Sequence, residues 1–302
     1  MAPIWSSLGL RKTNPIGVHR RSVIAALASG CATTSWPARE AGQARALGIN
    51  ISYLRRSGRS PTVVFESGLG DGLEVWNDLI NQLSPDIACF AYSRPGYGES
   101  ENGAGSTSRS SEQATALLHD LFRSAHVDPP YVLVGHSLGG LYIAHYASEF
   151  PGEVSGLVFV DGRPPGFRES CDARGIQFCG SNAIDPPSNW PTHIVAELSG
   201  MMASEDAVAT RVARIVGIPA VIITSTRVWP GENGDEGFAL WLEQQEAFAS
   251  GFRFHRFIRS EGTGHYVHRE QPTLVAREIE ALVRSDRSAS HDATMHDATK
   301  PA

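Results

Sequence analysis

The chain has 302 residues, of which 41% are hydrophobic and 19% charged, a composition typical of a soluble globular protein and not of a disordered one. Its formal net charge of −6 excludes the broad basic surface that binding to a nucleic-acid backbone requires. No run of about 18 apolar residues occurs, so we also expect no conventional membrane span. At about 150 residues per domain, the length alone predicts two domains.

Residues 1–45 are expected to form a leader outside the fold. Residues 1–22 carry four basic residues and no acidic one, and a short apolar segment, 23–28, follows. The pair Arg20-Arg21 before that segment resembles a twin-arginine export signal, and residues 27–31 resemble a lipoprotein cleavage box that would leave a lipid anchor on Cys31. We therefore expect a periplasmic or secreted protein. The alternative is a cytoplasmic protein with a disordered basic leader.

The middle of the chain alternates apolar strands with amphipathic helices. Near-continuous apolar strands separated by helices indicate a mostly parallel sheet that is buried on both faces by flanking helices. The expected strands are 62–65, 87–92, 131–134, 157–160, 219–223 and 252–258.

The interval between Asp161 and Ile218 breaks this alternation. It is rich in proline and contains no strand pattern, so we expect a cap insertion after the strand 157–160, at about 163–217. Cys171 and Cys179 lie within it, and they could form a disulfide in an oxidising compartment. Residues 285–302 repeat the sequence His-Asp-Ala-Thr and are expected to be a disordered tail. The remaining residues, 46–284, then form a single α/β domain, so the first estimate of two domains is too high.

The strand ending at Val134 runs directly into Gly135-His136-Ser137-Leu138-Gly139 and then into a helical segment. A G-x-S-x-G sequence between a strand and a helix is typical of a nucleophile elbow, in which glycines permit a sharp turn and the serine is exposed at its tip. The N-terminus of the following helix would favour negative charge developing at this point. Ser137 is therefore the candidate nucleophile.

With this elbow, the chain resembles the α/β-hydrolase fold family over about residues 48–284. Residues 66–70 (Glu-Ser-Gly-Leu-Gly) stand where the family places its oxyanion turn, with Ser67 where the commoner family sequence has histidine. Residues 92–100 resemble a family loop that we interpret as structural. Residues 262–268 are similar to the family's catalytic-histidine loop. The resemblance implies a serine esterase with the α/β-hydrolase fold.

A serine needs a base to remove its proton near neutral pH, and imidazole titrates in that range. His265 follows the last expected strand in a glycine-rich turn, in the chain order serine, acid, histidine that this fold uses. It is the candidate base. His136, beside the serine, is expected to pack within the elbow, and His268 is expected on the surface or at the start of a helix.

A third group must orient the imidazole. Asp161 directly follows the strand 157–160, and we predict it as the acid. The family's more usual position, a few residues after the strand 219–223, has no carboxylate until Glu232 and Asp235. Asp235 is the main alternative and Glu232 a further one.

The resemblance further implies an oxyanion hole formed by the backbone N–H groups of Leu69 and Leu138. Serine, histidine, aspartate and two amide donors perform acyl transfer, which predicts a carboxylic-ester hydrolase acting on a small ester-like molecule. The sequence has neither a dinucleotide fingerprint nor a metal cluster, so we expect no cofactor and no metal.

The substrate itself is left open. Trp190, Met201 and Met202 in the cap are candidates for an apolar pocket or for the cap's own core. Lactonase, thioesterase, peptidase and C–C hydrolase activities use the same triad, and a binding protein that keeps an idle hydrolase pocket is an alternative of another class. The sequence does not determine the oligomeric state.

Overall fold

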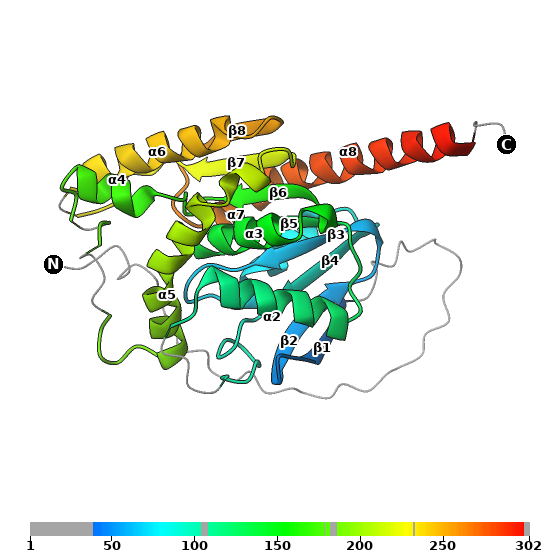
Figure 1. Cartoon of the computed structure of the whole chain (residues 1–302), viewed down its shortest axis with the longest axis horizontal. Coiled ribbons are helices and arrows are strands. Elements are labelled where there is room, and N and C mark those ends of the chain that lie inside the picture. Colours follow the sequence, from blue (N-terminus) through cyan, green and yellow to red (C-terminus); the bar gives the residue numbers. More distant parts are fainter. Residues whose placement is uncertain (1–38, 104–107, 178, 182–185, 232, 299–302) are drawn as a thin grey trace, which may run out of the picture.

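The computed structural model describes residues 39–103, 108–177, 179–181, 186–231 and 233–298. At its centre is one eight-stranded sheet with the strand order β1-β2-β4-β3-β5-β6-β7-β8 (Figure 1). β1 pairs antiparallel with β2, and β2 with β4, whereas all other neighbours are parallel. The strands are β1 (Arg39–Ala46), β2 (Ile49–Arg56), β3 (Arg59–Glu66), β4 (Ile87–Tyr92), β5 (Tyr131–His136), β6 (Val154–Val160), β7 (Ala220–Ser225) and β8 (His255–Ser260).

Helices cover both faces of the sheet, as the apolar strands predict. Successive side chains of a strand point to opposite faces, so Val63 and Val64 of β3 lie in two different hydrophobic cores. The first core includes side chains of α2, α3 and α5, and the second includes side chains of α1, α7 and α8. The helices are α1 (Asn77–Gln82), α2 (Ser111–Ser124), α3 (Leu138–Glu149), α4 (Phe167–Ala173), α5 (Thr192–Ala209), α6 (Gly234–Ser250), α7 (Val267–Glu270) and α8 (Pro272–Ala298), with 3-10 turns η2 (Leu73–Trp76), η3 (Pro151–Glu153) and η4 (Val212–Arg214).

The start of the fold differs from the expectation. The leader was expected to extend to residue 45, but β1 already begins at Arg39 and forms the edge of the sheet against β2. Of its eight side chains only that of Ala46 is fully buried, because an edge strand is held mainly by backbone hydrogen bonds to its neighbour. The export signal and Cys31 lie outside the described residues.

The end of the fold also differs. The expected tail, 285–302, overlaps α8, which continues to Ala298. The first part of α8 packs on the sheet through Val275, Ile279 and Val283. Arg287, inside the expected tail, donates hydrogen bonds from Nη1 to Asp86 Oδ2 (2.8 Å) and from Nε to Ser60 O (2.9 Å). Helix α8 therefore extends beyond the apolar residues by which it packs on the sheet.

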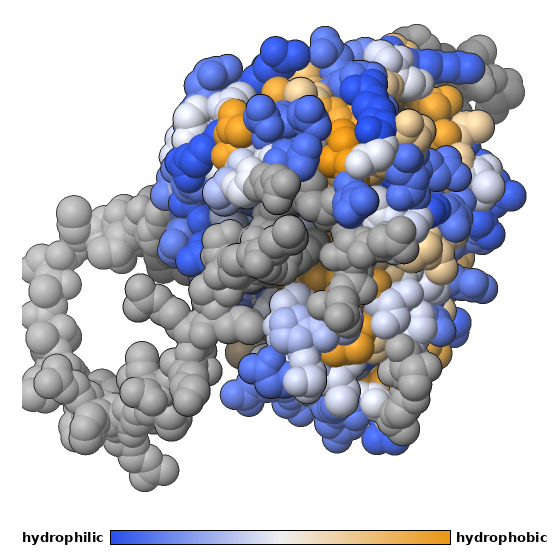
Figure 2. Space-filling model, turned by 90° about the vertical axis from the view of Figure 1, so that its left-hand side faces the viewer, coloured by the Kyte–Doolittle hydropathy of each residue, from blue (hydrophilic) through white to orange (hydrophobic). Residues whose placement is uncertain are grey.

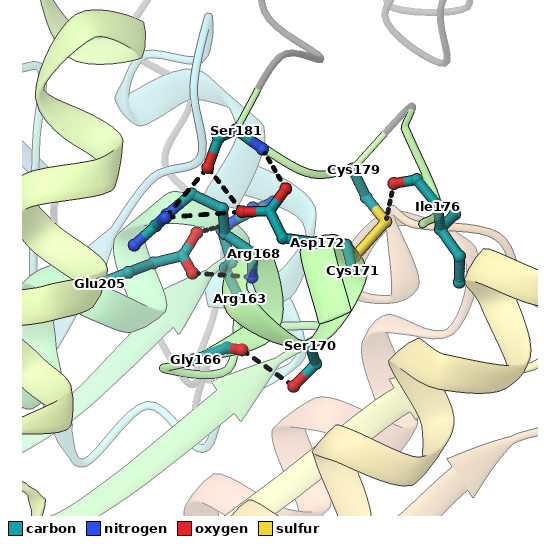
Figure 3. Close-up of a disulfide and its surroundings, with 10 residues drawn as sticks. All are labelled: Arg163, Gly166, Arg168, Ser170, Cys171, Asp172, Ile176, Cys179, Ser181 and Glu205. Carbon is teal, nitrogen blue, oxygen red and sulfur yellow. Dashed lines mark hydrogen bonds and ion pairs between the residues drawn. A yellow bond between two sulfur atoms is a disulfide. The ribbon is translucent and has the colours of Figure 1, made fainter. Parts of the chain in front are cut away.

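The interval between β6 and β7 holds α4, α5 and η4, which form a cap at one end of the molecule (Figure 1). A disulfide joins Cys171 of α4 to Cys179 (Figure 3). Figure 2 looks onto this end and shows hydrophobic patches between hydrophilic ones. In the described part of the chain, no helix is both long and apolar enough to cross a membrane.

Candidate active site

The turn between β5 and α3 places Ser137 at the carboxyl edge of the sheet. Ser137 has φ 53° and ψ −119°, a backbone conformation that residues other than glycine rarely adopt. The glycines on either side are required by close packing: a Cβ on Gly135 would lie 2.6 Å from the carbonyl oxygen of Gly139, and one on Gly139 would lie 2.4 Å from that of Glu66. The sequence pattern therefore corresponds to a strained elbow with serine at its tip.

Backbone hydrogen bonds hold the elbow in this shape. The carbonyl oxygen of Ser137 accepts bonds from the N–H groups of Gly140 (3.0 Å) and Arg163 (2.9 Å). Leu138 is the first residue of α3, where the helix itself offers no carbonyl for its N–H. The positive end of the helix dipole thus lies next to the serine, and it would stabilise negative charge developing there.

His265 and Asp161 lie in contact although they come from different strand ends. Nδ1 of His265, in the loop after β8, lies 2.7 Å from Oδ2 of Asp161, the residue that follows β6. The Asp161 side chain is fully buried, and that of His265 is 30% exposed. Because Nδ1 is used by the carboxylate, Nε2 is the ring nitrogen left for a reacting group.

Four further donors hold the Asp161 carboxylate. Its Oδ1 accepts hydrogen bonds from Ser225 N (2.9 Å), Thr224 Oγ1 (3.1 Å) and Trp241 Nε1 (3.1 Å), and its Oδ2 accepts one from Ser225 Oγ (3.0 Å). With the imidazole, both oxygens are saturated and the carboxylate has one orientation. The alternative acid Asp235 is exposed in the first turn of α6, and Glu232 lies outside the described residues.

His136 brings the His265 loop to the elbow. Nε2 of His136 lies 2.9 Å from the carbonyl oxygen of His265, and the two ring centroids are 4.7 Å apart. His136 directly precedes Ser137 in the chain. The proposed base is therefore fixed against the residue next to the proposed nucleophile, and His136 packs within the elbow as its sequence context suggests.

The turn after β3 lies against the same elbow. A Cβ on Gly68 would lie 2.7 Å from His136 Nδ1 and 3.2 Å from Ser137 Cβ, so the backbone at Gly68 runs directly beside the serine. Ser67, where histidine is commoner in the family, holds this turn from within: its Oγ donates to the carbonyl oxygen of Gly72 (3.0 Å) and accepts from Trp76 Nε1 (2.9 Å).

A buried group of titratable side chains lies behind the elbow. Oδ2 of Asp71 is 4.0 Å from His136 Nδ1, and burial raises the pKa of Asp71 to about 6, although a hydrogen bond with Tyr266 acts in the opposite direction. His268, expected on the surface or at the start of a helix, lies at the start of α7 and is fully buried, with its ring centroid 4.5 Å from that of Trp76. Burial lowers the pKa of His268 to about 3.

The cap residues expected to line a pocket do not share one environment. Met201 is buried in the core between the cap and the sheet helices, and Trp190 packs partly buried against that core. Met202, the next residue of α5, is 37% exposed. The buried methionine thus belongs to the core that holds the cap, while its neighbour faces outward.

Sequence reasoning missed Arg94, in the loop that we interpreted as structural. Its guanidinium is buried between Glu66 of β3 and Glu197 of the cap helix α5, and it also binds the carbonyl oxygens of the turn after β3. Nothing in the local sequence identifies Glu197 as its partner. The only signal in the sequence is that an arginine followed by Pro-Gly stands next to the end of an apolar strand.

Comparison with known proteins gives a consistent result. Residues 61–178 match the family model described as alpha/beta hydrolase fold. The chain is 26% identical over 229 residues to the uncharacterised protein YqjL of Bacillus subtilis, an alignment covering 73% of this chain and 83% of that protein. It is 33% identical over 130 residues to an esterase of Mycobacterium tuberculosis, covering 42% of this chain and 41% of the esterase. The chain spans less than half of the length of seven curated relatives, this esterase among them.

Solved structures with similar backbones include two kinds of hydrolase. A haloalkane dehalogenase loop variant from Bradyrhizobium elkanii superposes with a TM-score of 0.61 at 17% identity, covering 83% of this chain and 99% of that one. A thermophilic esterase from Thermogutta terrifontis superposes with a TM-score of 0.57 at 17% identity, covering 82% and 98%. At these identities, the likeness is one of fold.

Proposed function

Because the chain has the α/β-hydrolase fold, we propose that it is a serine hydrolase that cleaves carboxylic esters through an acyl-enzyme on Ser137. The observation that carries the proposal is the 2.7 Å contact between His265 and Asp161, with the His265 loop bound to the elbow that presents Ser137. His265 is the general base and Asp161 the acid that orients it.

In the first half-reaction, His265 Nε2 takes the proton of the Ser137 hydroxyl as Oγ bonds to the ester carbonyl carbon. The carbonyl π electrons move to the oxygen, which becomes the oxyanion of a tetrahedral intermediate. The N–H groups of Leu69 and Leu138 stabilise this oxygen, an effect of about 3 kcal/mol per donor. Collapse breaks the bond to the alcohol oxygen, which leaves with the proton held by His265.

In the second half-reaction, water replaces the alcohol. His265 takes a proton from the water as its oxygen attacks the acyl carbon, and a second oxyanion forms and collapses. Ser137 regains its proton and the carboxylic acid is released. Asp161 stabilises the imidazolium in both halves without itself being protonated.

The serine favours ester hydrolysis over the dehalogenation named for some of the structural neighbours. If Ser137 displaced a halide, the enzyme would carry an alkyl ether, which has no carbonyl carbon for water to attack. An acyl-serine, by contrast, is hydrolysed by the same base and the same two N–H donors that formed it. Lactones, thioesters and amides share this chemistry, so the triad does not distinguish them.

The proposal is tested with p-nitrophenyl esters of increasing acyl length, beside a lactone and an aminoacyl anilide. The wild-type protein is compared with Ser137→Ala and with the control Ser148→Ala. The control removes a buried hydroxyl of α3 that, among the described residues, bonds only to the carbonyl oxygen of His145. We expect ester turnover that Ser137→Ala abolishes and Ser148→Ala retains. A fluorophosphonate probe should label only proteins that have Ser137. Turnover that survives Ser137→Ala contradicts the mechanism, and a wild-type protein that takes up no probe would favour a binding protein.

We also propose export to an oxidising compartment. Two features support it: the basic segment with Arg20-Arg21 ahead of an apolar stretch, and the disulfide between Cys171 and Cys179. Fractionation of the expressed full chain tests this, since an exported protein is found outside the cytoplasm and the variant with both arginines replaced by lysine stays inside.

A further inference from the structure

We infer that Arg94 is a positioning residue for the oxyanion turn: it fixes the Gly68–Leu69 peptide so that the Leu69 N–H faces the reacting carbonyl. This inference rests on the proposed function, because it concerns the donor that would bind the oxyanion. Arg94 lies in the loop after β4, and only 1% of its side chain is exposed. It touches the turn backbone and does not contact the triad.

All five N–H groups of the guanidinium are used. Nη1 donates to Glu66 Oε1 (2.7 Å) and to the carbonyl oxygen of Ser67 (2.6 Å). Nη2 donates to the carbonyl oxygen of Gly68 (2.7 Å) and to Glu197 Oε2 (2.8 Å), and Nε donates to Glu197 Oε1 (2.7 Å). Since an arginine has five donors in one rigid plane, these bonds leave it a single position.

The bond to Gly68 determines where the next N–H points. A trans peptide is planar, and its C=O and N–H are directed to opposite sides. With the Gly68 oxygen bound to Arg94, the N–H of Leu69, in the same peptide plane, is directed away from Arg94. A Cβ built on Gly68 would lie 2.7 Å from His136 Nδ1 and 3.2 Å from the Cβ atom of Ser137. The residue whose carbonyl oxygen Arg94 binds therefore lies directly beside the serine.

A second side chain holds the following peptide. The Tyr97 hydroxyl accepts a hydrogen bond from the N–H of Gly70 (3.2 Å) and donates one to Glu197 Oε2 (2.8 Å). Glu197 is also bound by Arg109 Nη1 at 2.9 Å. The turn is thus tied, through Arg94 and Tyr97, to one carboxylate on the cap helix α5, so the cap takes part in fixing the oxyanion donor.

Arg56 offers a matched control for a role in stability alone. It is likewise buried, with 4% exposure, and its guanidinium binds the backbone oxygens of Ile80, Leu83, Ser84 and Ile87. Those contacts lie between β2, α1 and β4, and none involves the turn after β3. Arg56→Lys therefore reports what the loss of a buried arginine network does to folding.

The test compares Arg94→Lys, Tyr97→Phe and Arg56→Lys in the full chain. Lysine keeps the charge but cannot make the planar set of bonds. For each variant we would measure kcat and KM for p-nitrophenyl acetate, the affinity for phenylboronic acid, which forms a tetrahedral adduct on serine, and Tm. Arg94→Lys should lower both kcat and boronate affinity by about 10- to 100-fold with little change in KM, because a misplaced oxyanion donor acts on the transition state. Arg56→Lys should lower Tm but leave kcat within about twofold.

Folded Arg94→Lys with wild-type kcat and boronate affinity would overturn the inference, as would a change in KM alone. If Arg94→Lys does not fold, Tyr97→Phe provides the test, because it removes only one oxygen atom. A reduced boronate affinity of Tyr97→Phe at unchanged Tm supports positioning of the turn, and an unchanged boronate affinity overturns the inference. Ser137→Ala in the same assay separates the two proposals. Ester hydrolysis that survives in Ser137→Ala contradicts the hydrolase mechanism itself. If Ser137→Ala is inactive but Arg94→Lys and Tyr97→Phe keep the wild-type kcat and boronate affinity, only the positioning role is contradicted.

Discussion

Nδ1 of His265 lies 2.7 Å from Oδ2 of Asp161, across 104 positions of sequence. Asp161→Asn keeps the shape of this contact but replaces an acceptor by an amide, which favours the wrong tautomer of the imidazole. We expect kcat to fall by about 10³- to 10⁴-fold in steady-state ester hydrolysis. Asp235→Asn, the control on the exposed start of α6, should leave kcat nearly unchanged. The reverse pattern would assign the acid to Asp235.

Trp241 should tune the same carboxylate. Trp241→Phe removes the indole N–H that donates to Asp161 Oδ1 at 3.1 Å, while it keeps a ring in the cluster around Phe167. Loss of one hydrogen bond to a buried carboxylate costs about 1.5 to 3 kcal/mol, so we expect kcat to fall by about 10- to 100-fold. Phe167→Leu perturbs the same packing without a hydrogen bond, and an equal effect of both variants would point to packing alone.

Asp71 should make the protein less stable as pH rises. Its pKa is raised from 3.8 to about 6, so the folded state holds this proton more tightly than the unfolded state does, and stability is lost between these two values. At pH 8 the ionisation of Asp71 therefore lowers the free energy of unfolding by about 2 to 3 kcal/mol. Asp71→Asn should therefore stabilise the protein at pH 8 and not at pH 3.5 in urea unfolding. The exposed Asp128→Asn is the control, and a destabilised Asp71→Asn at pH 8 would contradict this account.

His268 should act in the opposite sense. Its pKa is lowered from 6.5 to about 3, so the unfolded state takes up a proton first and the folded state loses stability as pH falls from 6.5 toward 3. Neither ring nitrogen of His268 has a hydrogen-bond partner among the described residues. His268→Phe should then remove up to about 2 kcal/mol of the loss between pH 7 and 5. The exposed His255→Phe serves as control, and an unchanged acid slope in His268→Phe would refute this role.

The disulfide should stabilise the cap more than the sheet. Cys171 and Cys179 are 8 residues apart, and closing so short a loop is worth about 2 to 3 kcal/mol. We expect the Cys171→Ala/Cys179→Ala protein to be cut earlier within the cap during limited proteolysis, with the sheet still folded by circular dichroism. Dithiothreitol should have the same effect on the wild-type protein and none on the double variant. Equal protease resistance of both proteins would contradict this expectation.

The sequence predicts those parts of the fold whose signal is local. The apolar strands from β3 onward and the turn around Ser137 are both recognisable because each depends on residues adjacent in the chain. The hairpin of β1 and β2 escapes this reasoning, because β1 reads Arg-Glu-Ala-Gly-Gln-Ala-Arg-Ala and is held by backbone pairing rather than by apolar side chains. The helical extension of α8 into a polar repeat is missed for a similar reason.

The residues of the candidate site could be predicted from their order in the chain and from their positions after strands. Ser137, His265 and Asp161 each follow a strand, and the carboxyl ends of parallel strands share one edge of the sheet. No such rule predicts the hydrogen bonds of Arg94. Its partner Glu197 lies 103 positions away in a helix whose placement over the sheet no local pattern encodes.

Because the proposed acid, Asp161, follows β6, the segment after β7 contributes no residue to the proposed triad. Thr224 and Ser225, which bind the carboxylate, lie within β7 itself, and Thr226 and Arg227 bind the loop that carries His265. Beyond Arg227, residues 228–231 hold no member of the proposed triad. Within this stretch Trp229 packs against Trp241, the donor to Asp161, with the ring centroids 5.4 Å apart. Selection, in nature or in the laboratory, is therefore free to vary the exposed Val228 and Pro230 without displacing the acid, but not Trp229.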